Sequence, residues 1–149
     1  MRLALIVLGC VAFNAALLER AEAAQTCAWI VETVENDGAH KFTLNLSVDA
    51  PTTASVRFEG PGFTSGALGG ELIQLAPGEP KDVDSEGFDV DAGDDVGFNV
   101  KLFDHALTLD ELDEPKGTPL AEFIFHRKVG EAEKAPPADL AAKQCKTVG

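Results

Sequence analysis

The acidic run from Asp82 to Asp95 holds the residues best suited to chemistry. Its first six residues, Asp82 to Gly87, place oxygen ligands at positions one, three and five and glycine at position six, as an EF-hand calcium loop does. The sequence then departs from the EF-hand pattern. Position eight is Asp89 instead of an apolar residue, and position twelve, where a bidentate Glu belongs, is Gly93. One hypothesis is an irregular Ca²⁺ site with ligands from Asp82, Asp84, Asp89, Asp91, Asp94 and Asp95. The alternative is an acidic turn that keeps a strand edge soluble.

Other chemical motifs are missing from the sequence. The histidines are scattered without metal-binding spacing, and no serine lies in a Gly-x-Ser-x-Gly context. No Gly-rich phosphate loop is found either. The sequence therefore predicts a protein that is not an enzyme and that needs no cofactor.

The N-terminal residues 1–24 are predicted to be a signal peptide. Arg2 is followed by an apolar run from Leu3 to Leu18, and small residues precede a cleavage point near Ala24. The run is too short for a membrane anchor and ends in charge. We therefore expect a periplasmic or secreted protein that is not held in a membrane after cleavage.

Cys27 and Cys145 are the two cysteines that follow this segment. In an exported protein, a lone pair is most simply a disulfide. It would tie the start of the domain to its C-terminal tail. A redox-active pair is the alternative, although Cys-x-x-Cys spacing is missing.

The charge balance is strongly acidic, with a formal net charge of −13 at pH 7. The negative electric field of such a protein repels nucleic acid and anionic lipid, so neither is an expected partner. It attracts cations and basic protein surfaces.

Short strands dominate the rest of the chain. From His40 to Val48 apolar and polar residues alternate, which is typical of a strand with one buried face. Further strands are expected at 28–34, 54–59, 71–75, 88–90, 96–102 and 120–127, with a flexible loop at 66–70. Gly97 indicates a bulge or a close backbone approach. Thr108 and Glu111 form a capping-box pattern over a short helical turn.

About seven such strands predict an all-β, immunoglobulin-like antiparallel sandwich. We assign residues 25–128 to this domain and residues 129–149 to an Ala/Pro/Lys-rich tail, with a helical turn over 138–143, tied back by Cys145. The cysteines are terminal and Trp29 is in the first strand, so the likeness is to the architecture and not to antibody domains.

The order of features from Thr43 to Asp104 resembles the small periplasmic curli-assembly inhibitors of Gram-negative bacteria. Phe42-Thr43-Leu44-Asn45-Leu46 leads into Ala54-Ser55-Val56-Arg57-Phe58, followed by a Gly/Ser-rich loop. An apolar strand then runs into Leu75-Ala76-Pro77-Gly78-Glu79-Pro80, and a strand–Asp-Asp–strand unit follows at Phe88 to Val96. The Cys-x-Cys that one branch carries near Val56 is missing here. The resemblance implies an Ig-like fold and a role in keeping amyloid-forming subunits soluble.

The leading hypothesis is thus an exported binding protein for a protein client, acting as a chaperone-like inhibitor of curli-type amyloid aggregation. Polar strand faces would compete with pairing between client strands. The residues expected to bind the client are Lys41, Thr43, Asn45, Ser47, Arg57 and Glu59. A calcium-binding extracellular module and a structural domain of a secreted assembly are the alternatives.

Overall fold

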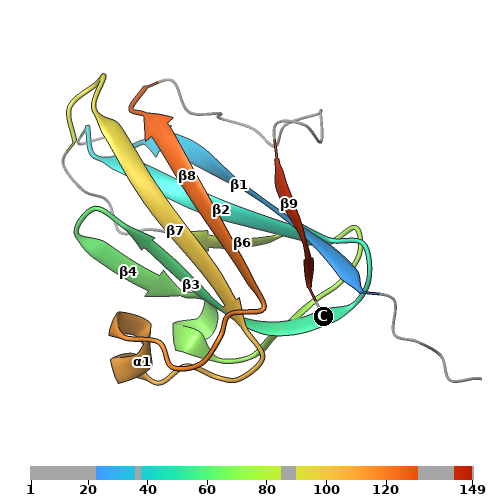
Figure 1. The fold of residues 1–149 in the computed structure, drawn as a ribbon. Helices are drawn as coiled ribbons and strands as arrows, with labels where there is room; N and C mark the ends of the chain where they lie inside the picture. Colours follow the sequence, from blue (N-terminus) through green and yellow to red (C-terminus); the bar gives the residue numbers. More distant parts are fainter. Residues whose placement is uncertain (1–22, 36–37, 85–89, 131–142, 149) are drawn as a thin grey trace, which may run out of the picture.

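Two antiparallel sheets pack face to face in the computed structural model, which describes residues 23–35, 38–84, 90–130 and 143–148 (Figure 1). The first, here called the β2 sheet, has the order β6 (Lys81–Asp84), β2 (His40–Val48), β1 (Ala24–Val34), β9 (Gln144–Val148). The second, the β7 sheet, has the order β4 (Phe63–Gly66), β3 (Thr52–Gly60), β7 (Asp95–Phe103), β8 (Ala121–Lys128). β5 (Ile73–Leu75) pairs with the start of β3. The prediction of an all-β sandwich is confirmed.

Alternation along the central strands builds the core between the sheets. The predicted inward row of β2 is confirmed, because Phe42, Leu44 and Leu46 are fully buried. The alternate residues of β7 from Val96 to Leu102 are buried in the same cluster. Phe42 of the β2 sheet meets Phe98 of the β7 sheet with ring centroids 4.8 Å apart. Aromatic burial thus joins the two layers.

A smaller apolar cluster lies outside this core. Phe103, Leu107 and Leu112 pack together where β7 leaves its sheet, beside the short helix α1 (Leu109–Asp113). Thr108 Oγ1 accepts a hydrogen bond from the Glu111 N–H (3.3 Å), and the Glu111 carboxylate accepts one from the Thr108 N–H (3.0 Å). This confirms the predicted capping box, which satisfies two otherwise unpaired donors.

A buried carboxylate connects the two sheets at the opposite end. Glu32 of β1 is fully buried, and His40 Nδ1 of β2 lies 2.6 Å from Glu32 Oε1. The backbone N–H of Gly130, just beyond β8, donates to both carboxylate oxygens at 3.0 and 2.9 Å. One side chain therefore joins β1 and β2 to the end of a strand in the other sheet.

Three strands lie where the sequence predicted none. β4 and the 3₁₀ turn η1 (Ala67–Gly70) replace the expected loop at 66–70, because the chain turns at Pro61-Gly62 and pairs back on β3. β6 begins the acidic run and pairs with β2. β9 lies in the predicted tail and extends the β2 sheet, so the boundary drawn after residue 128 separates this strand from its sheet.

Other predictions fall on residues outside the described ranges or differ in detail. Residues 1–22, Phe88 and Asp89 of the strand predicted at 88–90, and most of the turn predicted at 138–143 lie outside them. Gly97 is not a bulge, since it pairs with His126 in the unbroken register between β7 and β8. In the described part of the chain, no helix is long and apolar enough to span a membrane.

Candidate client-binding surfaces

The predicted client-binding residues lie on two opposite faces of the sandwich. Lys41, Thr43, Asn45 and Ser47 alternate with the buried row of β2, so they line the outer face of the β2 sheet. Arg57 and Glu59 lie in β3, and Val56 and Phe58 beside them are in the core. The two groups therefore lie on the outer faces of different sheets, and the structure does not bring them together.

The polar row of β2 runs along the middle of its sheet. All four side chains are partly exposed. Asn45 pairs with Asp82 of β6 on one side and with Trp29 of β1 on the other. The Asn45 amide donates to the Thr43 carbonyl oxygen at 3.2 Å. This row, here called the β2 polar face, offers hydrogen-bonding groups in fixed register beside an acidic strand.

Arg57 does not fit the predicted role of a client contact. It is only 5% exposed. Its Nε donates to the Leu112 carbonyl oxygen at 2.5 Å, and a terminal nitrogen donates to the Asp113 carbonyl oxygen at 3.2 Å. The other terminal nitrogen pairs with Glu59. The guanidinium therefore holds the C-terminal end of α1, where carbonyl groups lack helical partners, and only Glu59 of this pair offers surface.

Replacing Arg57 with methionine tests this structural role. We expect the free energy of unfolding to fall by about 1–3 kcal/mol, because two carbonyl oxygens lose charged donors in a buried place. Hydrogen exchange should accelerate most in residues 107–114. Urea denaturation measures the overall loss of stability but does not show where in the chain it arises. Lys101→Met in the neighbouring strand is the control. Unchanged exchange around α1 would contradict this role.

The acidic run does not assemble a metal site in the described residues. Asp82 pairs with Asn45 within the β2 sheet, whereas Asp95 begins β7 in the other sheet. Asp91 and Asp94 close a turn, in which the Asp94 N–H donates to the Asp91 carbonyl oxygen at 3.1 Å. Asp84 pairs with Thr43 in the ladder, and Asp89 lies outside the described ranges. No three His, Cys, Asp or Glu residues in these ranges are grouped as metal ligands.

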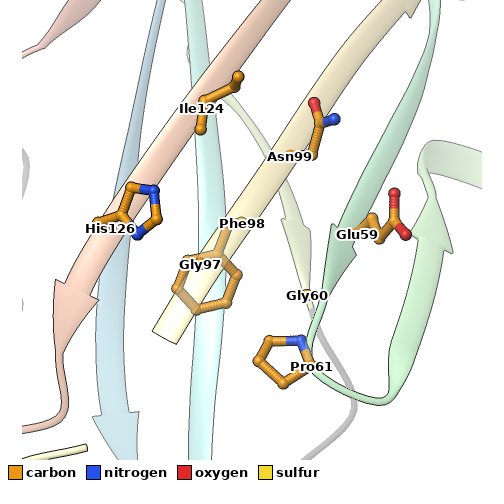
Figure 2. A pocket seen from close by; sticks show the side chains of 8 residues that line it. All are labelled: Glu59, Gly60, Pro61, Gly97, Phe98, Asn99, Ile124 and His126. Atoms are coloured by element: carbon orange, nitrogen blue, oxygen red, sulfur yellow. The ribbon is translucent and has the colours of Figure 1, made fainter. Parts of the chain in front are cut away.

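A shallow hollow on the β7 sheet was not predicted from the sequence (Figure 2). It measures about 430 Å³ and is lined by Glu59, Gly60, Pro61, Gly97, Phe98, Asn99, Ile124 and His126. Gly97 leaves the space open, and a Cβ there would meet His126 only at ordinary contact distance, 3.5 Å. Ile124 beside it is 57% exposed. The strand glycine was the one sequence signal for this hollow, which could take a single side chain of a partner.

Surface pairing explains three carboxyl groups with shifted pKa values. The hydrogen bond from Asn99 Nδ2, at 2.9 Å, lowers the pKa of Glu122, and Lys101 lowers it further. The backbone N–H and hydroxyl of Thr108 lower the pKa of Glu111, and His105 lowers the pKa of Asp104. A carboxyl group with a lowered pKa stays ionised at neutral pH, which suits a fixed surface charge better than a proton donor.

The predicted disulfide is present. Cys27 and Cys145 are bonded, and they are directly opposite each other in the β1–β9 ladder. No family model matches the chain, and neither the curated proteins nor the solved structures include a match. The surfaces described above therefore carry the argument on function.

Proposed function

We propose that the protein is an exported, non-enzymatic, immunoglobulin-like sandwich that binds a protein client and inhibits the aggregation of curli-type amyloid subunits. The resemblance of residues 43–104 to curli-assembly inhibitors suggests this role. The disulfide supports export, because such bonds persist in oxidising compartments.

The strand order supports the immunoglobulin-like class. β1, β2 and β6 lie in one sheet, as strands A, B and E do in that fold. β3, β7 and β8 lie in the other, as strands C, F and G do. β4 continues the second sheet and β9 continues the first.

The β2 polar face is the observation that carries the client-binding proposal. Every second side chain of β2 from Lys41 to Ser47 is polar and partly exposed. β2 lies between β1 and the acidic strand β6. An extended client segment laid on this face would find hydrogen-bonding partners at the spacing of its own side chains. The net charge of −13 would draw basic clients and keep protein–client complexes soluble. Transient contact of this kind competes with pairing between client strands.

An aggregation assay with a purified curli-type subunit tests the proposal. At substoichiometric amounts, the protein should lengthen the lag time of fibril growth. Asn45→Arg with Ser47→Arg should shorten that lag, because two long charged side chains cover the β2 polar face. The control places the same two arginines at Ile124 and His126 in β8, two exposed residues with the same spacing on the other sheet.

The results distinguish a wrong function from a wrong client-binding surface. A lag time that the wild-type protein leaves unchanged would exclude the inhibitor function. A loss of inhibition in the β8 variant alone would move the client surface to the hollow beside Gly97.

A further inference from the structure

The outer edge of β1 is covered by the chain's own C-terminal strand (Figure 1). β9 pairs antiparallel with Ala24–Ala28, and Cys145 is directly opposite Cys27. Val148, at the end of β9, is 5% exposed and belongs to the main core. In the described residues, no strand pairs with this edge of β1 beyond Ala28. Main-chain groups of β1 are thus paired by a short segment that a disulfide holds in place.

Lys143, just before β9, and Lys146 within it lie against aromatic rings of different sheets. Trp29 is 1% exposed and faces away from the core, since Ala28 and Ile30 beside it point inward. Lys143 Nζ lies 4.2 Å from the centroid of the Trp29 ring, and Lys146 Nζ lies 5.8 Å from that of Phe123 in β8. Gln144 Nε2 donates to the Ile124 carbonyl oxygen at 2.6 Å. Two lysines three residues apart therefore fit two rings on either side of the edge.

We propose that the β1 edge is a strand-addition site for an extended, lysine-bearing segment of another protein, and that β9 occupies it while the disulfide is intact. Strand addition supplies main-chain hydrogen bonds, and the side-chain positions supply specificity. Here Trp29 and Phe123 would select ammonium groups through cation–π contacts. The net charge of −13 favours the same basic partner.

The disulfide sets how strongly β9 competes with such a partner. While intact, it tethers β9 directly beside β1 and so keeps the effective concentration of β9 at this edge very high. A dithiol reductant would open the site by thiol–disulfide exchange. Two electrons pass to the Cys27–Cys145 bond, both cysteines become thiols, and the dithiol leaves as its own disulfide. This inference does not rest on the proposed inhibitor function, because its test contains no amyloid subunit.

Covalent capture by the Cys145→Ser full-length chain tests the site. The probe is the peptide Lys-Gln-Cys-Lys-Thr-Val, with its cysteine activated as a mixed disulfide with an aryl thiol. The Cys27 thiolate attacks the peptide sulfur and releases the aryl thiolate, whose absorbance gives the rate. The control peptide, Gln-Lys-Cys-Thr-Lys-Val, has the same composition and charge but moves each lysine to the other face of the strand.

We expect the first peptide to be captured about tenfold faster, since two cation–π contacts favour it. The emission of Trp29, the single tryptophan of the chain, should shift to the red in the variant and return after capture. Equal capture rates would overturn the proposal. If the variant is largely unfolded, capture of the first peptide should restore its sheet circular dichroism, and failure to do so would also overturn it. A variant that elutes as a dimer with Trp29 still covered would place a second copy in the site and overturn the assignment to another protein.

Discussion

Replacing Cys145 with serine should lower the free energy of unfolding by about 4 kcal/mol, because the Cys27–Cys145 bond closes most of the chain. The two cysteines are 118 residues apart. In the chain-entropy model a loop of this length gives close to the largest effect that one disulfide has. Urea denaturation of the oxidised wild type and the variant measures the difference.

Three further samples show whether the bond itself is responsible. Cys27→Ser, the double variant and the reduced wild type should all lose about the same stability, because each lacks the same bond. The two single effects would then not add, which is the signature of a directly coupled pair. A double variant that loses the sum of both single effects would contradict this interpretation and indicate lost packing instead.

Replacing Glu32 with alanine should lower the free energy of unfolding by about 3 kcal/mol. The carboxylate is fully buried, bonds to His40 and accepts the Gly130 N–H. Its removal leaves the His40 ring, whose side chain is only 13% exposed, and the Gly130 N–H without this partner. The loss should exceed that of an ordinary surface substitution several-fold.

A graded series identifies the cause. Glu32→Gln should cost less than Glu32→Ala, because an amide oxygen can still accept from Gly130 while the charge is lost. Glu79→Ala removes one negative charge from an exposed turn and is the control for net charge. Thermal and urea denaturation measure the order of stability of these variants. Equal stability of Glu32→Ala and Glu79→Ala would show that the buried carboxylate does not join the sheets energetically.

Local alternation was enough to predict the central strands. In β2 every second residue from Phe42 to Val48 is apolar, and this period fixes both the strand and its buried face. The capping pair Thr108 and Glu111 is likewise local, since both partners lie within one helical turn. The disulfide followed from counting, because only two cysteines follow the predicted signal peptide and they leave one pairing.

Long-range pairing could not be predicted in the same way. β6 begins an acidic run that also resembles a calcium loop, and only its register with β2 shows it to be a strand. β9 lies after a Pro-rich stretch, and its pairing with β1 spans most of the chain. In the alternation of β3, Arg57 lies between the core residues Val56 and Phe58, so the sequence alone predicts that it is exposed. Its burial depends on α1, which begins more than fifty residues later.

The β-sandwich class, the inward face of β2, the capping box and the cysteine pair were thus determined by the sequence itself. Their causes are short-range periodicity, one local hydrogen-bond motif and a simple count. The tertiary structure decided that the β2 polar face and Glu59 lie on opposite faces, that Glu32 joins the two sheets, and that β9 covers the edge of β1. These features depend on which distant segments meet, and a burial pattern with period two carries no information about the partner across the sheet.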